Sequence, residues 1–316
     1  MFCSFVIPTI GRASLERAIH SILFQDFEEN DIEIIIVNDS GLELPSGNWQ
    51  KSDWVTIINT NKRERNFARN SGAAIARGHY FWFLDDDDWI LPGALKAFWK
   101  LSQEHPNAAW LYGGLQIVNE KDQVLAEINS NLSGNCFAQI MGGAWAPIQT
   151  SIVSSKVFFQ LGGFNPHILG TEDLDLCRRY ACVGKFANTP EFVACLLRGE
   201  SWSTSTDYNR ATEDTKKSRD TILSEPSAFR RLIDSAKTPY WFGRILRIYL
   251  STVTWNLQHQ RIFTAMSRFF YSILVVLLAN KFLITRQFWA GLRADHVPDT
   301  LHFVMLDYER NLIKKR

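Results

Sequence analysis

The chain has 316 residues, of which 46% are hydrophobic and 21% are charged. This length allows one large or two modest domains with a buried core, and the composition excludes an intrinsically disordered protein. The net charge of +1 conceals two parts of opposite sign. Residues 1–225 carry 20 basic and 28 acidic side chains, whereas residues 226–316 carry 14 basic and 5 acidic ones. Such asymmetry indicates two roles, one of them at an anionic surface.

Cysteine usage and the N-terminus bear on the cellular compartment. The five cysteines are odd in number and form no C-x-x-C pair, which favours reduced thiols over a disulfide framework or a zinc site. The first residues lack the successive basic, apolar and cleavage regions of a signal peptide. We therefore expect a cytoplasmic protein.

The first hundred residues alternate between strand and helix patterns. Short apolar runs predict strands at residues 5–7, 32–37, 54–58 and 80–84. Apolar residues at helical spacing, and Pro92 as a helix start, predict helices at residues 14–24, 65–76 and 92–103. This alternation predicts a Rossmann-like, mostly parallel sheet with helices on both faces.

Later elements are less regular. A strand is expected at residues 109–118, and an irregular stretch rich in Asn, Ser and Gly follows to about residue 143. A helix at residues 171–183 and a strand at 191–197 complete the pattern. Pro226 is a plausible boundary, so we expect a catalytic domain at residues 1–225 and a helical C-terminal region at 226–316.

Four consecutive aspartates, Asp85 to Asp88, directly follow the predicted strand 80–84. In open α/β sheets, ligands bind beyond the carboxyl ends of the strands. Mg²⁺ and Mn²⁺ prefer oxygen ligands and are often held by one or two carboxylates together with substrate phosphates. The sequence thus predicts a metal site that bridges to a diphosphate. The alternative is an acidic, solvated loop or a helix cap.

Five motifs occur in order along residues 2–205: FVIPTIGR, VNDS, ARNSGAAIARGHYFWFLDDDDW, LGGFN and TEDLDLCRR. Together they resemble the inverting family 2 glycosyltransferases, which have the glycosyltransferase A fold. The resemblance implies a nucleotide-diphosphate sugar as donor, and a UDP-sugar is suggested because such donors are common in the family. It also implies Mg²⁺ or Mn²⁺ as cofactor and a glycan or lipid-linked acceptor. The C-terminal third lies outside these motifs.

The resemblance assigns donor-binding roles to five residues near the nucleotide. Pro8 and Thr9 would end the first strand beside the base, and Asp39 would contact the base. Arg69 and Asn70 match the family's "RN.G" helix, where the arginine lies near the nucleotide. The alternatives are a turn residue for Asp39 and a surface arginine for Arg69. Two further arginines, Arg63 and Arg65, are rival partners for the phosphates.

The same resemblance assigns the acidic residues. Asp85 and Asp87 are the outer pair of the family's D-x-D-D pattern and Asp88 follows, so these three are the expected metal ligands. By this resemblance Asp87 would be the main metal ligand, and Asp85 would also approach the ribose or sugar. Asp86 fills the variable position of the pattern.

Glu172 and Asp173 resemble the family's "ED" motif, whose aspartate is the catalytic base. Thr171 is a suitable N-cap, and carboxylates in a first helical turn are stabilised as anions, which suits a general base. The alternative is that these two residues have no catalytic role, because Asp and Glu are favoured in the first turn of any helix. Relatives also carry a late "R-x-H-x-x-S" segment, in which Glu200 stands here in the histidine's position.

These assignments predict a single inverting displacement that serves cell-surface polysaccharide or glycolipid synthesis. One alternative is a nucleotidyltransferase that makes sugar nucleotides, but the N-terminal motif lacks the Gly-rich phosphate loop expected of one. The other is a non-catalytic carbohydrate- or membrane-binding module of the same fold. The presence of Asp85, Asp87 and Asp173 argues against that loss of activity.

The C-terminal region has its own composition. Between residues 235 and 294 there is no acidic residue, while eight Lys or Arg alternate with many aromatic side chains. This pattern is typical of segments at a membrane interface, so we expect a peripheral enzyme at the inner face of the membrane. Its most apolar stretch, residues 269–279, is shorter than the roughly 20 residues of a transmembrane helix. The alternative is a helical bundle that packs on the acidic catalytic domain. A nucleic-acid role is not expected, since no recognised motif accompanies the charge.

Overall fold

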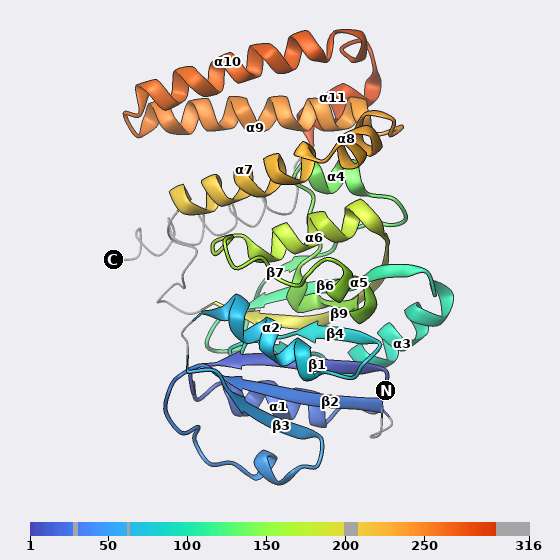
Figure 1. Cartoon of the computed structure of the whole chain (residues 1–316), viewed down its shortest axis with the longest axis vertical. Coiled ribbons are helices and arrows are strands. Elements are labelled where there is room, and N and C mark those ends of the chain that lie inside the picture. Colours follow the sequence, from blue (N-terminus) through green and yellow to red (C-terminus); the bar gives the residue numbers. More distant parts are fainter. Residues whose placement is uncertain (28–30, 62–63, 199–207, 295–316) are drawn as a thin grey trace. The chain divides into compact units, whose positions relative to one another are not determined.

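The computed structural model describes residues 1–27, 31–61, 64–198 and 208–294 (Figure 1). The chain divides into two compact units. One comprises Met1–Asn135 and Ala146–Asp220, and the other comprises Cys136–Trp145 together with the chain from Thr221 onward. The division therefore lies close to the predicted boundary at residue 226. The short segment Cys136–Trp145, which the sequence had assigned to the catalytic domain, groups with the C-terminal helices.

The first unit is built on one nine-stranded sheet with the strand order β3-β2-β1-β4-β8-β6-β9-β5, and β7 pairs with β6. The strands are β1 (Cys3–Thr9), β2 (Ile32–Asn38), β3 (Val55–Asn59), β4 (Tyr80–Phe83), β5 (Trp89–Ile90), β6 (Ala108–Val118), β7 (Val124–Ile128), β8 (Ser151–Ser154) and β9 (Lys185–Leu197). The four strands at the β3 end run parallel, as predicted. The rest is mixed, because β8 is antiparallel to both β4 and β6, whereas β9 is parallel to β6.

The helices of this unit begin and end close to the predicted positions where the sequence was periodic. They are α1 (Leu15–Leu23), α2 (Arg65–Ile75), α3 (Ala94–Glu104) and α6 (Glu172–Val183). Two more helices, α5 (Ser155–Gln160) and α7 (Tyr208–Ser224), were not predicted, and α7 leads into the second unit. Strand β9 is longer than the predicted 191–197, and β5, β7 and β8 were not predicted. These three strands have two to five residues, too few to show a clear period.

Helices cover both faces of the parallel strands, because alternate side chains point to opposite sides. Phe5 of β1 and Ile34 of β2 are fully buried in a core shared with α1 and α3. The next residues, Val6 and Ile35, face α2 on the other side. This two-sided burial explains why β2 is apolar at nearly every position, with Glu33 as the charged exception.

Helix α2 approaches the sheet very closely at Gly72. A Cβ atom at this position would lie 2.5 Å from Val6 Cγ1 and 2.9 Å from Val37 Cγ2. Only glycine therefore fits without displacing a strand. This close approach places the N-terminal half of α2 next to the carboxyl ends of β1 and β2, where the acidic loop also lies.

The second unit is helical. Its helices are α4 (Phe137–Met141), α8 (Pro226–Ile233), α9 (Thr238–Gln258), α10 (Ile262–Leu278) and α11 (Arg286–Arg293). Helix α9 contacts both α10 and α11, and α11 approaches it backbone to backbone. A Cβ atom on Gly243 would lie 2.0 Å from Phe288 O, and one on Gly291 would lie 2.1 Å from Tyr240 O. Among the residues that the structure describes, no helix combines the length and the apolar character needed to cross a bilayer.

Candidate active site

The site lies where β1, β2 and β4 end, because the carboxyl ends of parallel strands meet at one edge of the sheet. Backbone and side-chain hydrogen bonds join the three ends. The Asp39 N–H donates to Thr9 O at 2.8 Å, and the Thr9 hydroxyl donates to Asp86 Oδ2 at 2.6 Å. The three motifs that the sequence placed at separate strand ends therefore form one contiguous region.

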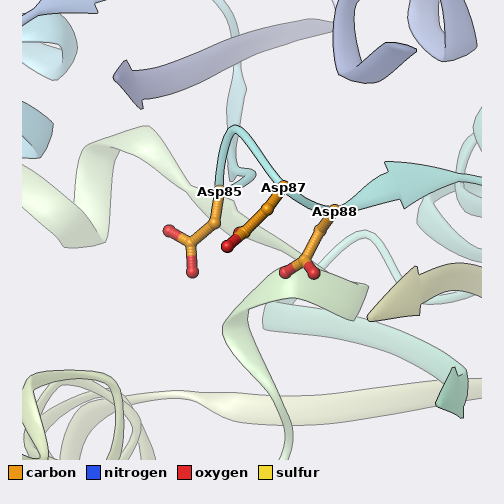
Figure 2. Close-up of side chains that lie close together, drawn as sticks. All are labelled: Asp85, Asp87 and Asp88. Carbon is orange, nitrogen blue, oxygen red and sulfur yellow. The ribbon is translucent and has the colours of Figure 1, made fainter. Parts of the chain in front are cut away.

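Asp85, Asp87 and Asp88 project from one side of the loop after β4 (Figure 2). One carboxylate oxygen from each lies within 4.8 Å of the others. A turn fixes this arrangement, since the Asp88 N–H donates to Asp85 O at 3.1 Å. Three converging carboxylate oxygens are the donor set that a hard divalent cation prefers, so the structure brings together the three predicted ligands. An acidic cluster of the predicted kind is present, and it is compatible with a divalent metal.

Asp86 is 3% exposed, as is Asp88, but its carboxylate binds the loop after β1 instead of joining the acidic cluster. It accepts the hydroxyl of Thr9 and, at 2.7 Å, Nη1 of Arg12. The same Nη1 lies 3.0 Å from Asp87 Oδ2. Asp86 therefore ties the acidic loop to the loop after β1. Arg12 is a site residue that the sequence argument did not single out, although it is the last residue of the FVIPTIGR motif.

The acidic loop concentrates negative charge. Burial, followed by the charge of Asp85, raises the pKa of the Asp87 carboxyl above its usual value. Burial and the charges of Asp85 and Asp87 raise the pKa of Asp88 well above that value. Burial would also raise the pKa of Asp85, but the Arg69 guanidinium, together with Arg65, outweighs it and lowers this pKa. A cation bound by the cluster would relieve the repulsion.

Arg69 connects the acidic loop to the ED motif. Its side chain is buried, with 1% of the residue exposed. Nη2 lies 2.5 Å from Asp85 Oδ1, and Nη1 lies 3.1 Å from Glu172 Oε1. Arg65, which is partly exposed, contacts the same Glu172 oxygen at 3.1 Å. These are charge-assisted hydrogen bonds, which are about twice as strong as neutral ones, and they hold two carboxylates 87 positions apart in the sequence beside each other.

Asp173 lies in the first turn of α6, one residue after Glu172. Its Oδ1 accepts the N–H of Leu174 at 2.8 Å. Burial raises the pKa of Asp173, while the nearby Arg69 and Arg65 lower it in part. Among the described residues no cation forms an ion pair with Asp173, whereas Glu172 has two such partners. Thr171 stands at the N-cap as expected, but its hydroxyl does not accept a capping hydrogen bond.

Comparison with known proteins identifies the family. The family described as "Glycosyl transferase family 2" matches residues 4–134, which include the acidic loop and α2. The chain is a glycosyltransferase whose residues 4–134 form a family 2 domain. The recognition made from the sequence motifs is thereby confirmed.

Two relatives illustrate the similarity of this glycosyltransferase to bacterial proteins. It is 26% identical over 230 residues to an uncharacterized glycosyltransferase of Haemophilus influenzae, covering 69% of this chain and 75% of that protein. It is 36% identical over 172 residues to the GalNAc(5)-diNAcBac-PP-undecaprenol beta-1,3-glucosyltransferase of Campylobacter jejuni. That match covers 49% of this chain and 54% of the relative, so it spans only about half of the Campylobacter protein.

A solved structure confirms the fold. Residues 1–349 of S. aureus TarS, in complex with UDP-GlcNAc, superpose on the glycosyltransferase with a TM-score of 0.60. The superposition covers 74% of this chain and 70% of that chain at 16% sequence identity. The predicted α/β fold with a glycosyltransferase A sheet and C-terminal helices is therefore correct.

Helix α2 of the glycosyltransferase also holds the segment that leads to α6. The Asn70 side chain donates to Phe164 O at 2.9 Å and accepts the Phe164 N–H at 2.8 Å. One turn earlier, Asn66 Nδ2 donates to Asn165 O and Ile168 O. Gly163 has a φ of +73°, and a Cβ there would lie 2.5 Å from Asn70 Oδ1. Asn70 thus positions the LGGFN segment, and its direct contact with the donor stays a prediction.

The remaining predicted donor-binding residues lie at the same edge of the sheet. Asp39 is 4% exposed, and its carboxylate accepts the Thr60 hydroxyl at 2.7 Å and the Glu64 N–H at 2.6 Å. It therefore fixes the start of α2. Pro8 is a partly exposed residue within β1. Contacts of these residues and of Thr9 with a nucleotide base stay predictions.

Two residues named from the sequence lie outside the described residues: Arg63, a rival partner for the phosphates, and Glu200, which stands in the position of the relatives' late histidine. Arg198, the last described residue before position 208, donates its N–H to Val118 O at 2.8 Å. Its charge lowers the pKa of Asp88 in part, so Arg198 lies close to the acidic cluster. The sequence signal for it was the arginine of the "R-x-H-x-x-S" segment.

Proposed function

We propose that this glycosyltransferase moves a hexose from a nucleotide-diphosphate sugar to an acceptor hydroxyl with inversion, in the synthesis of a cell-surface polysaccharide or glycolipid. The observation that carries the proposal is the Arg69 bridge. One buried guanidinium binds Asp85 of the acidic loop and Glu172 of the ED motif. It therefore sets the candidate base, Asp173, beside the residues expected to bind the donor.

The donor would bind at the edge of the sheet formed by the ends of β1, β2 and β4. Asp87, Asp85 and Asp88 are the residues that would hold Mg²⁺ or Mn²⁺, because their oxygens converge within the reach of one ion. Such an ion supplies Lewis-acid stabilisation of the charge that develops on a leaving diphosphate. Arg12, which already contacts Asp86 and Asp87, is a further cation available to this region.

The chemical step needs a base that is anionic and accessible to the acceptor. Asp173 accepts the proton of the acceptor hydroxyl, and the hydroxyl oxygen forms a bond to the anomeric carbon as the bond from that carbon to the diphosphate breaks. One displacement of this kind inverts the anomeric configuration. Glu172, held by Arg69 and Arg65, acts as a positioning residue for the first turn of α6. The transition state resembles an oxocarbenium ion, as in other glycosyl chemistry.

The names of the similar proteins support a choice of substrates. The Campylobacter relative is named for a glucosyl transfer to an undecaprenol-linked glycan, and the TarS structure was determined with UDP-GlcNAc. We therefore propose a UDP-hexose or UDP-N-acetylhexosamine as donor and a lipid-linked glycan as acceptor. An acceptor of this kind would place the enzyme at the inner face of the membrane.

A panel of nucleotide sugars tests the proposal. The full chain is incubated with each donor and a polyprenyl-diphosphate glycan, with Mn²⁺ or with excess EDTA, and release of nucleoside diphosphate is measured. The proposal predicts release from one UDP-sugar with Mn²⁺, little in EDTA, and a product with inverted configuration by NMR. A nucleotidyltransferase would instead release pyrophosphate from a nucleoside triphosphate and a sugar phosphate. Full activity in EDTA, or retention of configuration, would refute the mechanism.

A further inference from the structure

Helix α10 carries its large apolar side chains on the outside. The residues that it buries follow a spacing of three and four along the helix and are small or polar, with one valine: Ala265, Arg268, Ser272, Val275 and, just after the helix, Ala279. This stripe is the one that can face α9, which α10 contacts. A helix packed on its neighbour normally buries its apolar stripe and exposes its polar one. In α10 most of the large apolar side chains lie on the exposed side instead; Tyr271, whose ring stacks on Tyr249 of α9, is an exception.

The exposed face of α10 is apolar along its whole length. We call the following residues the α10 face: Ile262, Phe263, Met266, Phe269, Phe270, Ile273, Leu274, Leu277 and Leu278. All nine are at least 42% exposed, and Phe263 reaches 90%. Their exposed surface is on the order of 1,000 Å², above the largest apolar patch of a typical soluble monomer. Exposure on this scale marks an interaction site.

Charge is confined to the two ends of the α10 face. The one charged residue within α10 is Arg268, which is buried. Arg261 stands immediately before the helix and Lys281 shortly after it, and both are exposed. The 17-residue helix between these cations is about 25 Å long, at 1.5 Å of rise per helical residue. Next to Lys281 the chain exposes two more large apolar side chains, Ile284 at 90% and Trp289 at 46%.

We propose that the α10 face is a docking surface for an anionic lipid bilayer, with α10 lying in the plane of the interface. An apolar face bordered by cations and an aromatic side chain is what an interfacial helix needs. The helix does not cross the bilayer, because its other face carries Arg268 and packs within the unit. Arg261 and Lys281 contact the lipid headgroups at the two ends. This proposal goes beyond glycosyl transfer and does not depend on which sugar is moved.

A second copy of the chain is the competing occupant of this face. Two α10 helices packed antiparallel would place Arg261 of one chain beside Lys281 of the other. Packed parallel, they would bring identical cations together. Like charges at an interface oppose association, and from residue 235 to residue 294 the chain has no acidic residue to compensate. Anionic headgroups complement the same charges. The charge pattern therefore favours the bilayer.

Vesicle flotation of the full chain tests the proposal without donor or acceptor. The vesicles contain phosphatidylcholine alone, or phosphatidylcholine with phosphatidylglycerol. The test variant is Phe263→Ser/Phe270→Ser/Leu277→Ser, whose side chains are all more than 60% exposed. Its matched control is Phe24→Ser/Leu42→Ser in the first unit, at positions that are 81% and 72% exposed. Circular dichroism checks that both variants keep the helical content of the wild type.

The expected result is flotation of the wild type and the control with anionic vesicles, and weaker flotation with neutral ones. The triple variant should partition at least about 100-fold less, because three large apolar side chains no longer transfer into the bilayer. Equal flotation of triple variant and wild type would overturn the proposal. Failure of the wild type to float with anionic vesicles at low salt would also overturn the proposal. This holds if the wild type is a monomer, and it holds if the wild type is an oligomer that the triple substitution dissociates. Sugar transfer is not measured, so failure here leaves the proposed activity untouched.

Discussion

Replacement of Arg69 by Met tests whether the buried guanidinium holds the two acidic motifs together. Methionine has a similar length but no charge, so the substitution leaves Asp85 and Glu172 without their shared partner. Removing one member of a buried ion pair costs about 3–5 kcal/mol, a large part of a total stability of about 5–15 kcal/mol. For a unit of this size the midpoint of thermal unfolding should fall by about 6–20 °C.

Arg65→Met is the matched control, because Arg65 contacts the same Glu172 oxygen at the same 3.1 Å. Its side chain is 38% exposed, against 2% for Arg69. Exposed pairs contribute about 0–1 kcal/mol, so this variant should lose at most about 4 °C. Unfolding is followed by circular dichroism. The double variant Arg69→Met/Glu172→Gln should recover part of the loss, since it removes the charge of a buried carboxylate that would keep only the partly exposed Arg65 as its partner. Equal destabilisation by Arg65→Met and Arg69→Met would refute the inference that the buried Arg69 contributes more to stability than the partly exposed Arg65.

Four further outcomes follow from the site. Asp87→Ala should abolish sugar transfer and weaken Mn²⁺ binding, measured by electron paramagnetic resonance, whereas the exposed Asp53→Ala should change neither. Asp173→Asn should lower kcat by about 10²- to 10⁴-fold with unchanged donor affinity by calorimetry, and normal turnover would show that another group is the base. Because burial raises the pKa of Asp173, kcat should decline with falling pH at a value above the roughly 3.9 of a free aspartate; a flat profile down to pH 4 would contradict this. Asn70→Ala removes the two hydrogen bonds that Asn70 makes to the buried backbone of Phe164. It should lower the free energy of unfolding in urea by about 1–3 kcal/mol, and an unchanged free energy would contradict this role.

The sequence predicted the parallel half of the fold and the location of the acidic site. Strand β2 and the loop at Asp85 were predictable because a long apolar run and the aspartates after strand β4 are local signals. Long-range pairing was not predictable. Nothing in the sequence indicates that Arg69 and Glu172, 103 positions apart, share a hydrogen bond. Nor does it indicate that Asp86 contacts Thr9 while Asp85, Asp87 and Asp88 form the acidic cluster. Such partners are set by tertiary structure.

The C-terminal helices show another limit of periodicity. Composition indicated apolar, basic helices, but the usual rule assigns the large apolar stripe to the core. In α10 the stripe that faces the protein is the small and polar one, with Arg268 in it. Which of two stripes is buried depends on the neighbouring helix, which for α10 is α9. The sequence alone could not supply that information.

The division of the chain into two units limits how the enzyme can be dissected. Helix α4 comes from the middle of the sequence, yet it contacts α9. Arg244 of α9 donates a hydrogen bond of 2.9 Å to the carbonyl oxygen of Gly142, the residue that follows α4. A stop codon near position 225 would remove α9 and leave α4 with its apolar side chains uncovered. Excision of the sheet by one cut should therefore yield an aggregation-prone fragment. A minimal enzyme without the C-terminal helices therefore also needs a redesigned loop in place of residues 136–145. Exchange of this unit with a relative requires that residues 136–145 and the C-terminal helices be transplanted together.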